Sequence, residues 1–466
     1  MGEGKAEVMS STLGAEARLF RSEAGSHLFV VDGSRVYDLP EATALAVEQA
    51  FSPDYDAAAS RALLEALVGE QRPRYIDAEP LPLPPLFSLS LNVAQSCNMS
   101  CGYCYADRGK FGGTARVMGF DVAVASVDRL IAQSTPGADL VLGFIGGEPL
   151  LNRKLVHAIT AYGAEAARRA GRQMRFSMTT NATLIEPDDA RLFRDNRFYV
   201  AVSLDGDSLA NDRLRQMHDG GGSYQRVLEG IALLQHKGRP AHLSARATVT
   251  PATGELLPIL DHLVGLGFDS VGFSAVLTAP DPALAFSERD FTAFRRGMIA
   301  CGRKALEALK ERRSYPFSNF ETALHEIHRG THRPYPCGAG AGYLSVNAKG
   351  DLYACHRLVD DGNWRMGDVF SGTDDVRRAS HLASAHVDKM EPCRSCWARY
   401  LCGGGCYHEV ERRGRIGCDY IRGWLEFCLG AYAELSAARP DYFISARRDV
   451  GAARIDPVRA IGSGEA

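Results

Sequence analysis

Three cysteines near residue 100 have the spacing of ligands that share one metal centre. Cys97, Cys101 and Cys104 form a C-x3-C-x2-C motif in the segment SCNMSCGYC, with Tyr103 directly before the last cysteine. Thiolates are the usual ligands of iron–sulfur clusters, and a 4Fe–4S cluster normally takes four of them. Three thiolates would therefore leave one iron open to an external ligand. Structural zinc is the alternative, but it normally takes four closed ligands, and the closest histidine is His157.

A second group of cysteines lies in the last third of the chain. Eight thiolates are the number that two fully ligated 4Fe–4S clusters need. The C-x2-C pair at 393–396 would, taken alone, favour zinc. Cys301 stands outside both groups, and we expect it to be a buried small hydrophobic residue on a helix. The eight cysteines of the group are Cys337, Cys355, Cys393, Cys396, Cys402, Cys406, Cys418 and Cys428.

The composition is typical of a water-soluble globular protein of two or three domains. The chain has 466 residues, 45% of them hydrophobic and 23% charged, and a formal net charge of −3. This charge gives no reason to expect nucleic acid or a membrane surface as a partner. We find no apolar run near the roughly 18–20 residues of a membrane span and no secretory signal. We therefore expect a cytoplasmic protein, whose clustered cysteines serve metal or redox chemistry rather than disulfides.

The elements that must position these cysteines alternate between strands and helices. Helical patterns such as 152–171 and 223–238 separate six β-rich runs. Repeated strand–helix units predict parallel strands with right-handed crossovers. Six units predict an α/β fold with a partial (β/α)6 barrel of the TIM type, and a doubly wound sheet is the alternative. The predicted strands are 88–93, 139–145, 174–180, 198–204, 242–249 and 269–275.

Most of the unusual polar motifs come directly after a predicted strand. The cysteine triplet follows the first strand and GGEP (146–149) follows the second. TTN (179–181) ends the third strand and SLDG (203–206) ends the fourth. Active sites of β/α barrels form at the carboxyl ends of the strands. The sequence therefore predicts that these motifs share one site.

The flanking segments predict two further domains. Residues 1–85 are expected to form a small α+β domain, in which HLFVVDGSRVYDLP makes two strands around an Asp-Gly turn. The proline-rich stretch 78–87 marks its end. We assign 86–320 to the barrel, 321–435 to a cysteine-rich domain with a hairpin turn at Lys349–Gly350, and 436–466 to a loosely ordered tail.

The triplet with its aromatic residue, followed by GGEP, resembles the signature of radical S-adenosylmethionine (radical SAM) enzymes. The resemblance implies that S-adenosylmethionine binds the open iron through its amino and carboxylate groups. Reductive cleavage of the ligand then yields a 5′-deoxyadenosyl radical, which abstracts a hydrogen atom from the substrate. The cofactor supplies this chemistry and the protein positions it.

The resemblance assigns other residues of this edge to the same ligand. Gly146 and Gly147 let the backbone approach closely, and Glu148 is expected to accept hydrogen bonds from the methionyl ammonium. Arg215 matches the arginine that binds the methionyl carboxylate in the family, and a solvated surface arginine is the alternative. The remaining residues expected in the cofactor pocket are Tyr103, Asn181, Ser203 and Asp205.

The spacing of the second cysteine group resembles the SPASM domain of peptide-modifying radical SAM enzymes. That domain carries two auxiliary clusters, which would bring the total to three 4Fe–4S clusters. The resemblance implies an inner cluster held by Cys337, Cys355 and Cys406, with Cys428 as its fourth ligand or as a core residue that leaves an iron open. The ligands implied for the outer cluster are Cys393, Cys396, Cys402 and Cys418.

One departure from a related family bears on the reaction. Sulfatase maturases have an aspartate, which acts as a base, directly after the cysteine that Cys355 matches, and this chain has His356 there. A histidine could accept a proton, but a structural role is the stronger expectation. The difference argues against the sulfatase-maturase reaction. Asp205 is a candidate base for a substrate thiol.

The overall pattern is most similar to the maturase family of quinohemoprotein amine dehydrogenase, which makes thioether bonds between cysteine sulfur and Asp or Glu carbons. The resemblance implies a cysteine-containing peptide or small protein as substrate and a reductant such as flavodoxin or ferredoxin. The alternatives are a radical SAM enzyme that oxidises a protein side chain or acts on a small molecule, and a non-catalytic iron–sulfur electron carrier.

Overall fold

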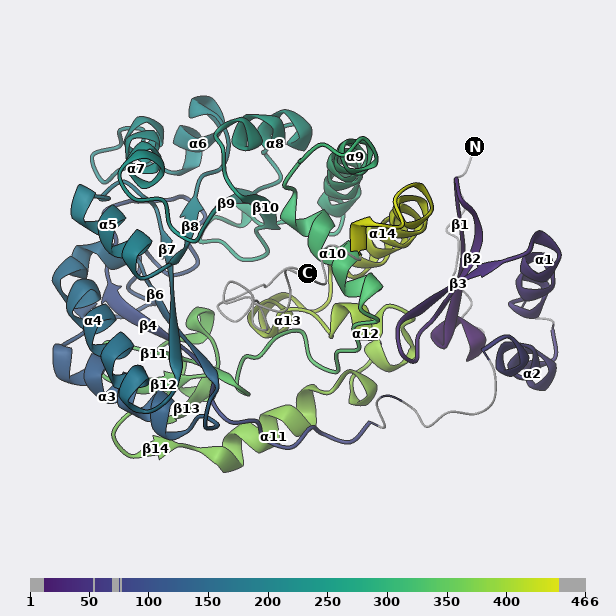
Figure 1. Ribbon diagram of the computed structural model, residues 1–466, viewed down its shortest axis with the longest axis horizontal. Coiled ribbons are helices and arrows are strands. Elements are labelled where there is room, and N and C mark those ends of the chain that lie inside the picture. The colour runs from purple at the N-terminus through teal and green to yellow at the C-terminus, as the bar shows by residue number, and fades with distance from the viewer. Residues whose placement is uncertain (1–11, 53–54, 69–74, 76–77, 444–466) are drawn as a thin grey trace.

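The computed structural model describes residues 12–52, 55–68, 75 and 78–443. Figure 1 shows a small sheet with two helices at one side of the molecule and a much larger sheet with its covering helices at the other. The last long helix, α14 (Cys418–Ala438), lies between the two parts and packs against both. Among the described residues, every helix is too short or too polar to cross a bilayer.

Six parallel strands form the barrel part of the larger, 11-stranded sheet, and they follow one another in chain order. Each strand begins and ends close to the bounds of its predicted range. The β-branched and aromatic residues on which each prediction rests are the residues that fill the core. Phe144, Phe176 and Phe198 stack on neighbouring strands or at their ends, with ring centroids 5.3–6.4 Å apart. The predicted partial (β/α)6 barrel is confirmed. Its strands are β4 (Ser88–Gln95), β6 (Asp139–Gly146), β7 (Gln173–Thr180), β8 (Tyr199–Ser203), β9 (His242–Val249) and β10 (Ser270–Ala275).

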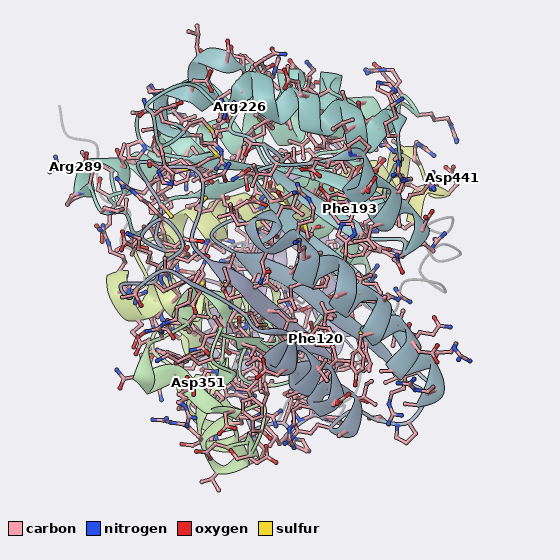
Figure 2. The ribbon with its side chains drawn as sticks, turned by 90° about the vertical axis from the view of Figure 1, so that its left-hand side faces the viewer. Phe120, Phe193, Arg226, Arg289, Asp351 and Asp441 are labelled. Carbon is pink, nitrogen blue, oxygen red and sulfur yellow. The ribbon has the colours of Figure 1, made fainter. Side chains whose placement is uncertain are left out.

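Helices cover the outer face of this sheet. Each presents apolar residues at helical spacing, as in α4, whose buried positions Val156, Ile159 and Gly163 recur three or four residues apart. In Figure 2 the helices that carry Phe120 and Phe193 lie on this same outer face. The covering helices are α3 (Phe120–Ala132), α4 (Arg153–Arg169), α5 (Pro187–Asp195), α6 (Ser208–Leu214), α7 (Tyr224–His236), α8 (Leu256–Gly265), α9 (Asp290–Lys310) and α10 (Ser318–His328).

The N-terminal unit is a three-stranded antiparallel sheet with two helices. The strands are β1 (Ala17–Ser22), β2 (Gly25–Val30) and β3 (Arg35–Leu39), and the helices are α1 (Glu41–Ala50) and α2 (Ala57–Val68). The structure has the expected hairpin of β2 and β3 around Asp32 and Gly33. Strand β1 was not predicted, because the two arginines in ARLFRS obscure the alternation that marks a strand.

The cysteine-rich region extends the large sheet instead of standing apart from it. Strand β11 (Tyr343–Val346) pairs in parallel with β4, and β12 (Asp351–Tyr353), β13 (Arg365–Asp368) and β14 (Gly372–Thr373) follow as antiparallel neighbours. The predicted hairpin turn at Lys349–Gly350 is present between β11 and β12. The remaining elements are β5 (Arg116–Val117), α11 (Asp375–Ala385), α12 (Arg399–Cys402), α13 (Tyr407–Arg413) and the short 3-10 helices Thr12–Ala15, Pro149–Asn152, Pro282–Leu284, His356–Leu358, Gly362–Trp364, Val387–Lys389 and Cys393–Ser395.

A buried histidine joins the N-terminal unit to the rest of the molecule. His332 lies 3.6 Å from the Asp32 carboxylate and hydrogen bonds to Ser34, and its ring packs 3.9 Å from that of Tyr400. Burial lowers the pKa of His332 to about 4, although Asp32 opposes the shift. The imidazole is therefore neutral at this junction near neutral pH.

We expect the stability of this junction to fall in mild acid. Below its ordinary pKa of 6.5, His332 takes up a proton readily only in the unfolded chain, so stability is lost as the pH falls from about 6.5 towards 4. Between pH 7 and pH 5 the loss should reach about 2 kcal/mol. Thermal unfolding of wild type and His332→Gln at both pH values measures it. The stability of His332→Gln should change less between pH 7 and pH 5 than that of wild type or of the exposed control His236→Gln. An equal change in His332→Gln and wild type would show that His332 is not the group responsible.

Candidate active site

One large cavity opens where the carboxyl ends of the parallel strands meet the cysteine-rich region. It has about 1060 Å³ of open space, and β6 to β10 each contribute lining residues from their last positions. The loop after β4 adds the cysteine triplet, and Arg357 and Glu409 come from beyond the barrel. Its lining includes Cys97, Cys101, Tyr103, Cys104, Tyr105, Gly146, Gly147, Thr180, Asn181, Ser203, Arg215, Thr248, Arg357 and Glu409.

The cysteine triplet faces this cavity as one group. The Cys97 thiol interacts electrostatically with those of Cys101 and Cys104. The turn is fixed by a hydrogen bond from the Cys104 N–H to the Cys101 carbonyl (3.1 Å). Burial raises the pKa of Cys97 to about 12, so a free thiolate is costly there. A bound metal would offset that cost, because it supplies the positive charge that thiolates need.

The GGEP loop packs directly against the start of the cysteine loop. The Gly147 N–H donates to the Ala94 carbonyl and the Glu148 N–H to the Ser96 carbonyl, both at 2.9 Å. Gly146 has a φ of +148°, and a Cβ atom there would overlap the Ala94 carbonyl oxygen. A Cβ atom at Gly147 would overlap the Ser96 carbonyl. Only glycine fits at both positions, and this fixes the wall beside Cys97.

Glu148 points into the protein and does not line the cavity. Its carboxylate accepts hydrogen bonds from the N–H groups of Leu150 (3.0 Å) and Asn181 (2.8 Å) and from the Thr180 hydroxyl (2.8 Å). The side chain is fully buried, and burial raises its pKa to about 7. This geometry does not favour the expected contact with a ligand ammonium. Glu148 instead joins the GGEP loop to the end of β7.

Arg215 reaches the cavity behind the cysteine triplet. Its Nη1 donates to the Tyr103 hydroxyl (2.8 Å), and the guanidinium interacts electrostatically with the Cys101 thiol. The side chain is buried, and among the described residues neither its Nε nor its Nη2 has a hydrogen-bond acceptor; Nε is closed off from solvent, whereas Nη2 is not. An unpaired N–H of a buried guanidinium is a site for an anion, and a carboxylate matches its geometry. The alternative of a solvated surface arginine is excluded by this burial.

Asp205 is the next residue of the same network. Its two carboxylate oxygens accept hydrogen bonds from the Tyr103 hydroxyl (2.5 Å) and the Thr248 N–H (2.8 Å). Burial raises the pKa of Asp205, and the Arg215 charge opposes this shift. Asp205 does not line the cavity. It is therefore placed to orient Tyr103, and the geometry does not support the expected role as base for a substrate thiol.

The cysteines of the C-terminal region divide into two groups by their mutual electrostatic interactions. Cys337, Cys355 and Cys406 form the inner group, which lies towards the cavity. Cys428 is fully buried on α14, and its thiol is influenced by burial alone, which raises its pKa. The structure therefore does not bring Cys428 to the inner group. The outer group contains Cys393, Cys396, Cys402 and Cys418.

His356 and Arg357, its neighbour in the sequence, lie in different surroundings. His356 is buried, lies 3.2 Å from the Tyr343 hydroxyl and does not line the cavity. Burial lowers its pKa to about 3. These features agree with the structural role that the sequence favoured and not with a base. Arg357, in contrast, lines the cavity and donates from Nη1 to the Glu409 carboxylate (2.5 Å).

Tyr105 connects the triplet with the inner cysteine group. Its hydroxyl interacts electrostatically with Cys104 on one side and with Cys355 and Cys406 on the other. The Arg357 guanidinium carbon lies 5.2 Å from the centroid of the Tyr105 ring. Sequence reasoning missed Tyr105, Arg357 and Glu409. The signal that could have found them is their position one, two and three residues after Cys104, Cys355 and Cys406.

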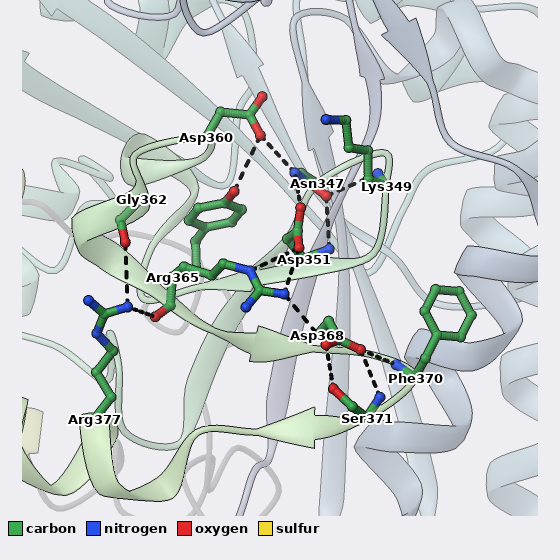
Figure 3. A network of polar contacts seen from close by, with 11 residues as sticks. Asn347, Lys349, Asp351, Asp360, Gly362, Arg365, Asp368, Phe370, Ser371 and Arg377 are labelled. Atoms are coloured by element: carbon green, nitrogen blue, oxygen red, sulfur yellow. Dashed lines mark hydrogen bonds and ion pairs between the residues drawn. The ribbon is translucent and has the colours of Figure 1, made fainter.

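A polar network holds the hairpin that precedes Cys355 against the barrel. Figure 3 shows Asp360 bonded to Asn347 (2.7 Å), with Asp351, Arg365 and Asp368 linked on the other side of the hairpin. Asp360 also accepts a hydrogen bond from Gln95 at the end of β4 (2.7 Å). The loop that carries Cys355 and Arg357 is therefore anchored to the strand that leads into the cysteine triplet.

Comparison with known proteins agrees with this geometry. Residues 91–274 match the family model of the radical SAM superfamily. The serine-type anaerobic sulfatase-maturating enzyme of Bacteroides thetaiotaomicron is 30% identical over 76% of this chain and 90% of its own length. The Klebsiella aerogenes enzyme of the same name is 26% identical over 77% and 89%.

Two solved structures share the fold. The structure of anSMEcpe with bound AdoMet superposes with a TM-score of 0.65 at 20% identity, over 78% of this chain and 98% of that one. Streptococcus suis SuiB bound to its precursor peptide SuiA gives a TM-score of 0.51 at 14% identity, over 86% and 96%. Both alignments extend beyond the barrel into the flanking regions of the chain.

Proposed function

Because this chain belongs to the radical SAM superfamily, in the group that contains the serine-type anaerobic sulfatase-maturating enzymes, we propose that it uses S-adenosylmethionine to abstract a hydrogen atom from a peptide or small protein. The observation that carries the proposal is the shared cavity. Three thiols, a glycine wall and a buried guanidinium with an unpaired N–H line it together.

The residues of the cavity fit a 4Fe–4S cluster with bound S-adenosylmethionine. Such a pair supplies reductive cleavage of the sulfonium and a 5′-deoxyadenosyl radical. In this assignment Cys97, Cys101 and Cys104 hold the cluster. Arg215 binds the methionyl carboxylate through its Nη2, which is unpaired and is not closed off from solvent, and Tyr103 and Asp205 keep the guanidinium in place. Gly146 and Gly147 allow the ligand to lie close to the backbone, and Asn181 and Ser203 complete the polar wall.

The C-terminal cysteines are proposed to hold two auxiliary 4Fe–4S clusters. The inner group would supply three thiolates and the outer group four. Donation of electrons by a small redox protein such as flavodoxin or ferredoxin belongs to the same proposal. The N-terminal unit, with its small antiparallel sheet, is proposed to recognise the peptide. These assignments follow the family likeness together with the grouping of the thiols.

Removal of Cys428 tests the composition of the inner site. Because its thiol lies in the apolar core, Cys428→Ala should leave the iron content per chain and the visible absorbance unchanged. Cys406→Ala should lower the iron content by about one cluster's worth. Iron and sulfide analysis after anaerobic reconstitution measures both. If Cys428→Ala lost as much iron as Cys406→Ala, its thiol would have to be a ligand.

For the reaction itself we propose formation of an intrapeptide thioether from a cysteine sulfur to an Asp or Glu carbon. Two observations on relatives support a peptide substrate. SuiB has been solved with its precursor peptide, and anSMEcpe with bound peptides. The narrower choice of a thioether rests on the likeness of this sequence to thioether-forming maturases. His356 supports it as well, because it stands where sulfatase maturases have their catalytic aspartate.

A second candidate is oxidation of a protein side chain. It is favoured by the 30% identity with a sulfatase-maturating enzyme over nine-tenths of that protein. The two reactions leave different chemical marks. A thioether consumes a cysteine thiol, whereas oxidation of a side-chain alcohol creates an aldehyde. Both remove two hydrogen atoms, so mass alone does not distinguish them.

Co-expression with candidate cysteine-containing peptides, followed by mass spectrometry, tests the proposal. The expected product has lost two hydrogen atoms per crosslink, resists alkylation by iodoacetamide and does not react with a hydrazide. A hydrazide-reactive product would favour side-chain oxidation. The modification should disappear with Cys97→Ala, and a product that survives this variant would refute the radical mechanism. A chain that binds iron but never cleaves S-adenosylmethionine would be an electron carrier.

A further inference from the structure

The cavity contains a second guanidinium that the proposed binding of S-adenosylmethionine does not use. Arg215 reaches the cavity from the barrel, next to Cys101, whereas Arg357 reaches it from the cysteine-rich region. Tyr105 lies between the two groups of cysteines, and the Arg357 guanidinium lies over its ring. The position of Arg357 is therefore on the side of the cavity towards the inner cysteines, away from the Arg215 site.

Arg357 is held firmly but retains free donors. Its Nη1 donates to Glu409 (2.5 Å), and its side chain is 24% exposed. Among the described residues, neither its Nε nor its Nη2 has a hydrogen-bond acceptor, and neither is a buried unpaired atom. These two donors therefore open to solvent in the cavity. A guanidinium carries its positive charge at every pH at which the protein would be assayed.

The charge of the cavity favours an anionic ligand at this place. Its described lining residues include two guanidinium groups, Arg215 and Arg357, and a single carboxylate, Glu409. A guanidinium with two free N–H groups forms parallel hydrogen bonds with a carboxylate. The bond to Glu409 and the Tyr105 ring beneath the guanidinium hold the group in place before a ligand arrives, which lowers the entropic cost of binding.

We propose that Arg357 binds a carboxylate of the substrate peptide and so selects an acidic residue for the reaction. The proposal rests on the proposed function, since it names the substrate class of the same cavity. Glu409 positions the guanidinium and does not itself contact the acidic group. The carboxylate can come from an Asp or Glu side chain or from the C-terminus of a peptide, and the test separates these sources.

Binding of small probes to the reconstituted holoenzyme, loaded with S-adenosylmethionine, tests this without turnover. The side-chain probe is N-acetyl-aspartate N-methylamide, the C-terminal probe is N-acetyl-alanine, and the neutral control is N-acetyl-asparagine N-methylamide. Ligand-observed saturation-transfer NMR measures each titration. We expect saturable binding of the aspartate probe and at least about tenfold weaker binding of the neutral control, because charged hydrogen bonds carry the affinity.

Variants identify the residue responsible. Arg357→Gln should weaken binding of the aspartate probe about tenfold. Arg357→Lys keeps the charge but loses the planar fork, so its affinity for the probe should lie between those of wild type and Arg357→Gln. The control Arg377→Gln removes an exposed arginine that bonds to backbone carbonyls, visible in Figure 3, and should bind the probe like wild type. Iron content and absorbance show that each variant is folded.

The outcomes separate this proposal from the proposed function. Equal binding of charged and neutral probes, or an unchanged affinity in Arg357→Gln, would overturn the carboxylate site. Tighter binding of N-acetyl-alanine than of the aspartate probe would support the site with a peptide C-terminus as its ligand. Failure of the holoenzyme to cleave S-adenosylmethionine would refute the proposed function and leave these binding results standing.

Discussion

Cys97→Ala should abolish the reductive cleavage of S-adenosylmethionine. With one thiol of the triplet missing, the iron that binds the ligand is no longer held in the cavity, and formation of 5′-deoxyadenosine should fall at least about a thousandfold. The variant should also lose the iron of one cluster while keeping that of the C-terminal groups. Anaerobic reconstitution with iron and sulfide, followed by chromatographic detection of 5′-deoxyadenosine under dithionite, measures both quantities.

Cys301→Ala is the matched control for this loss. Cys301 is fully buried on α9, apart from both cysteine groups, as the sequence indicated. Its replacement removes a thiol from the chain without touching the cavity, so iron content and cleavage should stay at the wild-type level. Retention of cleavage in Cys97→Ala would mean that the triplet does not hold the reactive iron, and the proposed function would have to be abandoned.

Gly147→Ala should also slow the reaction strongly, although it removes no ligand. The added methyl group would overlap the Ser96 carbonyl and lie 2.9 Å from the Cys97 nitrogen, both of them backbone atoms that cannot turn aside. The cysteine loop must then shift away from the glycine wall. Displacements of about 1 Å at a reacting centre can cost about a hundredfold in rate, and the strain should cost about 1–3 kcal/mol in stability.

The control here is Gly254→Ala, where no atom lies within 4 Å of the added methyl group. This variant should behave like wild type in thermal unfolding and in 5′-deoxyadenosine formation. Gly147→Ala should instead show a lower melting temperature and slower cleavage at full iron loading. Wild-type behaviour of Gly147→Ala in both assays would show that the GGEP loop tolerates movement. The close approach of Gly147 to the Ser96 carbonyl would then not be needed for the reaction.

The barrel could be predicted from the sequence because its signal is local. Six β-rich runs separated by helical periodicity determine parallel strands, and the motifs that follow the strands must then share one edge. Strand β1 escaped prediction because two arginines interrupt its short alternating pattern. The pairing of β4 with β11 escaped it as well, because neither segment carries a sequence signal for a partner 255 residues away.

Side-chain direction within the site could not be read from the motifs. Glu148 and Asp205 belong to the expected motifs, yet each gives both of its carboxylate oxygens to donors within the protein. His356 and Arg357 are neighbours in the sequence, but His356 contacts Tyr343 in the interior, whereas Arg357 lies over Tyr105 and faces the cavity. Such choices depend on tertiary contacts, which spacing alone does not encode.

The continuity of the large sheet limits how this chain can be divided. All eight residues of β4 are buried, and β11 satisfies the backbone of its first half. A fragment that ends at residue 320 would keep the pairing of β4 with β6 but leave the other edge of that half of the strand without a partner. Its bare N–H and C=O groups would then be a template on which other chains can assemble. Attempts to produce the barrel alone should therefore yield insoluble aggregates. In the full chain, the cysteine-rich region covers this edge and so prevents self-association.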